Sequence, residues 1–131
     1  MLVNRLPGVR FVIDHAGKPP IESGPRESWQ TMIADLARAR NTVCKVSGLI
    51  TESGWDSWTV AQIRPFVETV VEAFGEDRLL FGSDWPVCLL AGGYSEVLTL
   101  ARDTLAQVSA EKVFAANARR IYGLPEPAAM T

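Results

Sequence analysis

The stretch LLFGSDWPV, residues 79–87, runs from an apolar, strand-like start through Gly82 and Ser83 into the carboxylate of Asp84. Acidic residues are poor strand formers and are costly to bury, so a buried strand should end at this point. Two explanations for the acid stay open. Asp84 forms a turn ahead of Trp85 and the proline that follows, or it is placed at the strand end for chemistry.

Two further segments share the character of this strand. Each of the three is short and apolar on both faces instead of alternating, which is typical of parallel strands covered on both sides. No two of them are close enough in sequence for a tight hairpin. The predicted strands are VRFVID at 9–14, TVCKVS at 42–47 and RLLFGS at 78–83.

Apolar residues recur at helical spacing between and after these strands. Serine residues at the starts and glycine residues at the ends supply capping signals, and Pro65 fits the first turn of its helix. The predicted helices are 27–40, a short one at 57–63, then 64–75, 95–106 and 109–123. The predicted caps are Ser28, Ser95 and Ser109 at the starts, and Gly75 and Gly123 at the ends.

Strands that alternate with helices predict an α/β fold with a parallel sheet, here built from three βα units. The chain has 131 residues and is 47% apolar, which predicts one folded domain rather than a disordered chain. We assign this domain to residues 1–124 and expect residues 125–131 to form a loose tail.

Composition and charge exclude several classes of partner. The formal charge is −2, and basic runs with interleaved aromatic residues are absent, so we expect no nucleic acid partner. Apolar runs fall short of the roughly 20 residues of a membrane helix, and the start of the chain does not resemble a signal peptide. Cys44 and Cys88 stand alone in apolar segments, which predicts reduced core residues. We therefore expect no membrane partner and a cytoplasmic location.

Polar residues of unusual character mark all three strands. His15 follows the first strand, Lys45 lies within the second, and Asp84 ends the third. In parallel α/β proteins, functional sites gather at the carboxyl ends of the strands. Strand alternation groups His15 with Ile13 and Lys45 with Val43, so the three polar side chains share one pocket if these faces point to the same side.

Structural explanations compete with the functional one for each residue. His15 could bond a turn carbonyl, Asp84 could form a turn, and Lys18 fits a solvated loop residue. Trp85 fits a packing residue or a pocket wall. Lys45 argues most strongly for a site, because an ammonium group in an apolar strand needs a partner or a polar cavity. Three polar residues at three strand ends favour a shared site.

Four segments in this order and at these spacings resemble a known family. They are FVIDHAGKP at 11–19, CKVSGL at 44–49, FGEDRLLFGSDWPV at 74–87 and NARRIYGL at 117–124. Together they resemble the C-terminal half of amidohydrolase-related proteins, in the branch of the sugar-lactone and 2-pyrone-4,6-dicarboxylate lactonases, with the L-fuconolactonase-like proteins nearest. The resemblance covers essentially the whole of the proposed domain.

This resemblance implies a (β/α)8 barrel in which the three predicted strands are the sixth, seventh and eighth. It implies that Asp84 is the general base on the attacking water and that His15 polarises the substrate carbonyl or binds metal. The substrate is expected to be a sugar lactone or related cyclic ester, contacted by Lys45 and Trp85. The cofactor stays open between none and a divalent metal such as zinc, with His15 and Asp84 as candidate ligands.

One departure from the family is large. The family carries an HxH pair on its first strand, whereas this chain has a single histidine. A complete barrel needs ~250 residues, so we expect a fragment that is inactive alone and that self-associates through exposed edges. Its inner sheet face should expose Phe11, Ile13, Val43 and Leu80. Two alternatives stay open: a decarboxylase or other hydrolase of the same superfamily, and a non-catalytic remnant.

Overall fold

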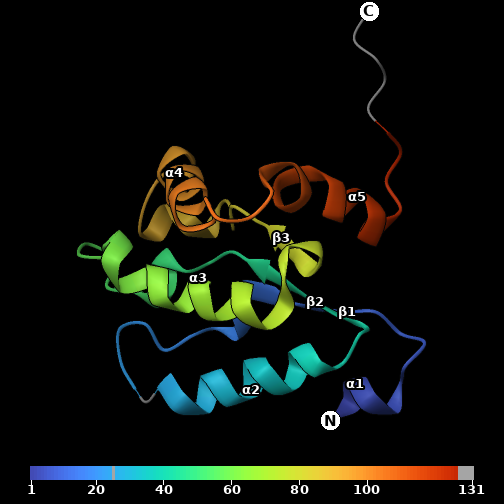
Figure 1. Ribbon diagram of the computed structural model, residues 1–131. Helices are drawn as coiled ribbons and strands as arrows, with labels where there is room; N and C mark the ends of the chain where they lie inside the picture. The colour runs from blue at the N-terminus through green and yellow to red at the C-terminus, as the bar shows by residue number, and fades with distance from the viewer. Residues whose placement is uncertain (25, 127–131) are drawn as a thin grey trace, which may run out of the picture.

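The computed structural model describes residues 1–24 and 26–126. At its centre lies a parallel sheet with strand order β1-β2-β3 (Figure 1). The strands are β1 (Phe11–Ile13), β2 (Thr42–Val46) and β3 (Leu79–Phe81). Both strand pairs are parallel, as predicted, and each strand is shorter than the sequence indicated. In the register, Cys44 of β2 is opposite both Ile13 and Leu79.

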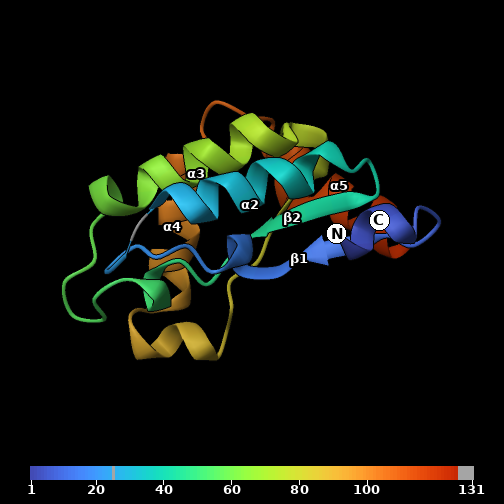
Figure 2. The ribbon, with the colours of Figure 1, turned by 90° about the horizontal axis from the view of Figure 1, so that it is seen from below.

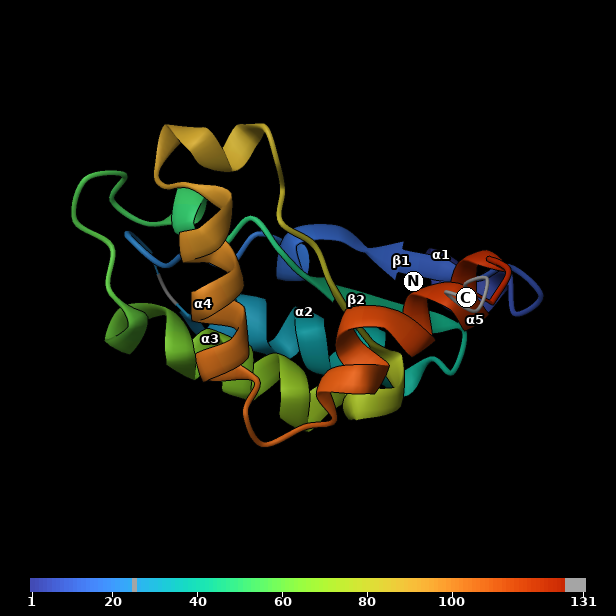
Figure 3. The ribbon, with the colours of Figure 1, turned by 90° about the horizontal axis from the view of Figure 1, so that it is seen from above.

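Helices lie on both sides of this sheet. In Figure 1, α2 lies below the strands and α3 runs in front of them, while α4 and α5 lie above. Although α4 lies higher in this view, its buried residues belong to the same core as those of α2 and α3. Figure 2, from below, brings α2 and α3 to the front, and Figure 3, from above, brings α4 and α5 forward. The helices are α1 (Leu2–Arg5), α2 (Arg26–Arg38), α3 (Val60–Phe74), α4 (Tyr94–Thr104) and α5 (Asn117–Tyr122). In the described residues, no helix is long and apolar enough to cross a membrane.

The main core packs α2 and α3 against one face of the sheet. Cys44 and Leu79 of that face are fully buried with Ile33 of α2 and Val70 of α3. Both cysteines are free and buried, as predicted. Burial raises the pKa of the Cys44 thiol to about 12, with the charge of Asp14 adding to the effect. The thiols are therefore neutral core groups.

The opposite face of the sheet is covered by the C-terminal helix. Val43 and Leu80 are 5% and 1% exposed, because Ile121 and Ala118 of α5 pack over them. The prediction that these two residues lie exposed on the inner face was wrong. Phe11 and Ile13 are half-buried, and Ile13 packs into the main core, on the face covered by α2 and α3. Short-range sequence patterns do not show that a distant helix returns to cover a sheet.

The two helices predicted at 57–63 and 64–75 form the single helix α3. Thr59 begins it as N-cap, accepting from the Gln62 backbone N–H while the Gln62 side chain accepts from Thr59 N. This capping box starts the helix well before Pro65, which lies inside the helix instead of in its first turn. Gly75 ends α3 with φ 69°, as predicted.

Two predicted serine caps were also wrong. Ser28 lies inside α2, which begins at Arg26. Ser95 lies in the first turn of α4, whose cap position is Gly93, and the Gly93 N–H donates to Glu96 Oε2 at 2.7 Å. Glycine serves here because the Glu96 carboxylate reaches back to its backbone. Within the predicted tail, residues 127–131 lie outside the described residues.

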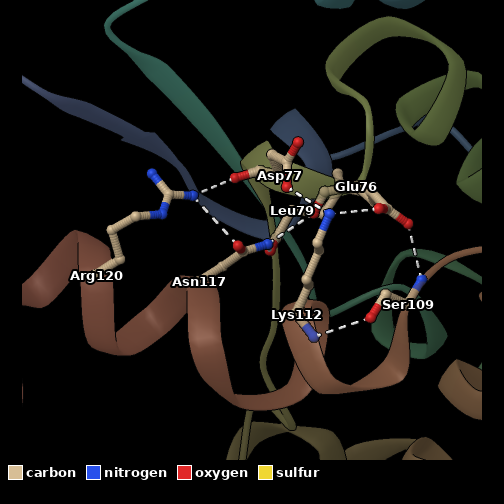
Figure 4. Close-up of polar contacts among 7 residues, drawn as sticks. All are labelled: Glu76, Asp77, Leu79, Ser109, Lys112, Asn117 and Arg120. Carbon is tan, nitrogen blue, oxygen red and sulfur yellow. Dashed lines mark hydrogen bonds and ion pairs between the residues drawn. The ribbon is translucent and has the colours of Figure 1, made fainter.

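The predicted helix 109–123 contains a π-helical turn, Lys112–Ala116, followed by α5. Ser109 is its N-terminal cap, with its Oγ accepting from Lys112 N at 3.4 Å, and Gly123 ends it at φ 65°. The buried Asn117 side chain donates to the carbonyls of Glu76 and Leu79 (Figure 4). These bonds tie the helix to the start of β3.

Charged groups strengthen the same junction. Lys112 Nζ lies 2.6 Å from Glu76 Oε1 and 2.9 Å from Asp77 Oδ1, and Glu76 Oε2 accepts from Ser109 N at 3.0 Å (Figure 4). The hydrogen bond from Lys112 holds the pKa of the Glu76 carboxyl below its ordinary value, with help from the Ser109 amide. The same ammonium group lowers the pKa of Asp77.

This junction predicts acid-sensitive stability. Because both carboxyl pKa values are lowered in the folded chain, their contribution is present above the unfolded value of about 4 and is lost as pH falls through the folded values. We expect Lys112→Gln to flatten the dependence of unfolding free energy on pH between about 5 and 2, measured by urea denaturation. Lys18→Gln, which removes the Lys18–Glu52 pair, is the control. An unchanged slope in Lys112→Gln would contradict the assignment.

Candidate active site

His15 lies just past β1 in a left-handed turn. Its φ is 52°, and the next three residues also have positive φ. This turn carries the imidazole over the end of β2, where Nδ1 lies 3.0 Å from Ser47 Oγ; which atom carries the hydrogen depends on the tautomer. The side chain remains 32% exposed, so the imidazole is accessible at the carboxyl edge of the sheet.

Asp84 approaches the same point from the loop after β3. Its side chain is 14% exposed, and Oδ1 lies 3.9 Å from His15 Nδ1. Asp84 has φ 59°, and its carbonyl accepts from Cys88 N at 2.9 Å at the start of the loop. The structure therefore brings His15 and Asp84 together at the carboxyl ends of the outer strands.

Gly48 forms the floor between these two side chains. Its φ is 62°, and a Cβ at this position would lie 2.8 Å from His15 Nδ1 and 3.1 Å from Asp84 Oδ2. Only a hydrogen atom fits there, so glycine is required by both conformation and space. Neither Gly48 nor Ser47 was predicted as a site residue from the sequence. The signal available for Ser47 was its position two residues beyond Lys45 on the same strand face.

Lys45 has a charged partner of its own. Its Nζ lies 2.6 Å from Asp14 Oδ1, and its side chain is 26% exposed. Burial lowers the pKa of the ammonium, but the hydrogen bond with Asp14 and the interactions with Tyr122 and Asp14 outweigh this, so the net shift is upward. Lys45 is therefore a cation at neutral pH.

The stem of Lys45 lies on the same side of the sheet as Ser47. A Cβ on Gly82 would lie 3.0 Å from Lys45 Cδ and 3.1 Å from Ser47 Cβ. Gly82, at the end of β3, thus leaves room for both side chains. Lys45 borders the space next to Ser47, and its ammonium is directed to Asp14.

Trp85 directly follows Asp84 and is 64% exposed. It therefore does not pack in the core, which was one of the two explanations offered for it. Val87, Leu89 and Leu90, which follow in the same segment, are 50%, 59% and 53% exposed. The segment 85–90 thus presents four exposed apolar side chains directly after Asp84, around the buried Cys88.

A metal would find two donors here. His15 and Asp84 face one another, but the described residues contain no group of three or more His, Cys, Asp or Glu side chains that could hold a metal ion. A catalytic zinc generally has three protein ligands and a water molecule. The described part of the chain therefore does not by itself make a zinc site.

Active sites of α/β barrels lie at the carboxyl ends of the strands, which is where His15 and Asp84 meet in this sheet. The profile of the amidohydrolase family matches residues 2–124, and the chain belongs to this family. An amidohydrolase from Burkholderia multivorans, solved with bound zinc, superposes with a TM-score of 0.89 over 95% of this chain and 47% of its own, at 36% identity. The predicted fold, the C-terminal part of such a barrel, agrees with this match.

Curated relatives support the lactonase resemblance. An L-fucono-1,5-lactonase from Burkholderia multivorans is 40% identical over 90% of this chain and 44% of its own length. A second L-fucono-1,5-lactonase, from Burkholderia ambifaria, is 47% identical over 70% of this chain and 31% of its length. The chain thus spans less than half the length of the curated relatives it matches.

Proposed function

We propose that this chain supplies the sixth to eighth strands of a barrel that hydrolyses a sugar lactone. One observation carries the proposal: Asp84 and His15 meet at 3.9 Å over Gly48, with Ser47 holding the imidazole. The Burkholderia multivorans lactonase, whose match spans 90% of this chain, supports the choice of substrate class.

Asp84 acts as the general base in this proposal. Water attacks the lactone carbonyl carbon while the Asp84 carboxylate takes its proton. The tetrahedral intermediate then collapses, the ring C–O bond breaks, and the proton passes from Asp84 to the departing ring oxygen. His15, with Nδ1 directed to Ser47, uses its second ring nitrogen to stabilise the negative charge on the carbonyl oxygen.

Lys45 and Trp85 are proposed to bind the rest of the substrate. The Lys45 cation, held by Asp14, donates hydrogen bonds to a substrate hydroxyl or carboxylate. The exposed indole of Trp85 covers an apolar face of the sugar ring beside Asp84.

A divalent metal such as zinc has support from the zinc-bound Burkholderia multivorans amidohydrolase. His15 and Asp84 would be two of its ligands, and at least one more would have to come from outside the described residues. Bound there, the metal would polarise the carbonyl or the water.

Both cysteines are free and buried, which suits a reducing compartment, and we propose the cytoplasm.

The chain alone is expected to show no lactonase turnover, with or without added zinc, because it spans under half of its relatives and has one histidine. A chimaera tests the function: this chain replaces the matching C-terminal part of the Burkholderia multivorans lactonase. We expect the chimaera to hydrolyse L-fucono-1,5-lactone and the chain alone to remain inactive.

Light scattering on a size-exclusion column, run beside the assay, measures whether the chain alone self-associates, as its open sheet edges predict. Circular dichroism shows whether the chimaera is folded. A folded chimaera without turnover, or a monomeric chain that hydrolyses the lactone alone, would contradict the proposed function as stated.

A further inference from the structure

The turn that carries His15 has an unusual backbone. Four consecutive residues have positive φ: His15 at 52°, Ala16 at 50°, Gly17 at 67° and Lys18 at 54°. Three of them bear a Cβ, for which the left-handed region is disfavoured. Such a turn persists only when its surroundings hold it.

A side chain of α2, that of Trp29, forms a hydrogen bond to the backbone of this turn. The indole Nε1 of Trp29 donates to the Ala16 carbonyl at 2.8 Å, in a buried hydrogen bond. Trp29 is 4% exposed and Ala16 is 1% exposed, so water cannot readily replace this donor. Within the turn, Lys18 N donates to the His15 carbonyl at 2.8 Å.

Packing fixes the position of the indole itself. The Trp29 ring meets the Phe66 ring of α3 edge-on, with centroids 5.3 Å apart. Gly17 is pressed against α2 so closely that a Cβ there would lie 2.8 Å from Met32 Cε. The turn is thus seated on α2, and the indole N–H is its polar anchor.

We propose that Trp29 is a positioning residue, whose indole N–H fixes the left-handed turn and thereby directs His15 toward Ser47 and Asp84. Without this donor the buried Ala16 carbonyl is unsatisfied, which favours a different backbone conformation at the turn. The imidazole then loses its place beside Ser47. The proposal rests on the proposed function only in regarding His15 as catalytic.

The single histidine makes the test direct, because every imidazole resonance of the chain belongs to His15. In Trp29→Phe, which keeps an aromatic ring and removes the donor, we expect the ¹⁵N shifts of the His15 ring to move to the averaged tautomer values of a free imidazole. We also expect the Lys18 amide to exchange with solvent about tenfold faster or more. Both are measured by NMR on the full chain.

Trp58→Phe is the matched control. Trp58 Nε1 donates to the Ala91 carbonyl, also at 2.8 Å, outside the turn. The Trp58→Phe variant removes the same kind of bond and should leave the His15 ring shifts and the Lys18 exchange rate unchanged. Equal changes in both variants, or an unchanged His15 ring in Trp29→Phe, would overturn the proposal.

The unmutated chain provides a second measurement if Trp29→Phe does not fold. The Trp29 indole N–H should then exchange at the same rate as the Lys18 amide, and far more slowly than the indole of Trp55, which is 51% exposed. Exchange of the Trp29 indole as fast as that of Trp55 would refute the role. Because none of these readouts requires turnover, an inactive chimaera leaves this test intact.

Discussion

Replacing Asp84 by asparagine in the active chimaera should lower kcat for lactone hydrolysis by about 10²- to 10⁴-fold, the usual contribution of a general base. The amide has nearly the same shape as the carboxylate but cannot accept the proton of the attacking water. Because Asp84 is 14% exposed and held at the loop start by its own backbone, the fold should be retained.

Asp35→Asn is the control for this substitution. It makes the same chemical change at a surface residue of α2 that pairs with Arg38 at 2.6 Å, and it should leave kcat unchanged. The measurement is kcat as a function of pH for each variant. Near-normal kcat with an unchanged pH profile in Asp84→Asn would show that another group is the base.

Substituting Gly48 by alanine should be nearly as damaging to catalysis. The added methyl group would lie 2.8 Å from His15 Nδ1 and 3.1 Å from Asp84 Oδ2, so the imidazole or the carboxylate has to move. A misplacement of about 1 Å can cost ~10²-fold in rate, and we expect a loss of kcat of that order in the chimaera. The left-handed φ adds a stability cost of about 1–2 kcal/mol.

Gly123→Ala separates these two effects. Gly123 has φ +65°, close to that of Gly48, but a Cβ there would meet nothing within 4 Å. It should therefore show the backbone cost in urea unfolding without the loss of kcat. Equal kcat in the two alanine variants would mean that Gly48 does not define the space between the candidate catalytic side chains.

The strands were predictable from the sequence because a parallel sheet buried on both faces leaves a local mark, short apolar runs separated by helical periodicity. The position of the His15 side chain was less predictable. Alternation placed it on the face of Ile13, yet Ile13 packs with the helices while His15 reaches Ser47. The period of two applies to extended backbone and ends where the left-handed turn begins.

The partner of Lys45 illustrates the same limit. The sequence indicated that an ammonium group in an apolar strand needs a partner, and the structure provides Asp14. Asp14 and His15 are adjacent in sequence but contact different residues, Lys45 and Ser47 respectively. Gly48 could not be identified, because the need for glycine depends on two side chains that approach it from other strands.

Because α5 packs over Val43 and Leu80, these residues stay uncovered during synthesis until α5 has been made. A ribosome makes the sheet well before the helix that covers it, and Ile121 follows Leu80 by about 40 residues, or roughly 2–8 s at ~5–20 residues per second. During that interval these apolar side chains lack their cover. The nascent chain therefore exposes this face of the sheet to chaperones until α5 has been made and has docked on it.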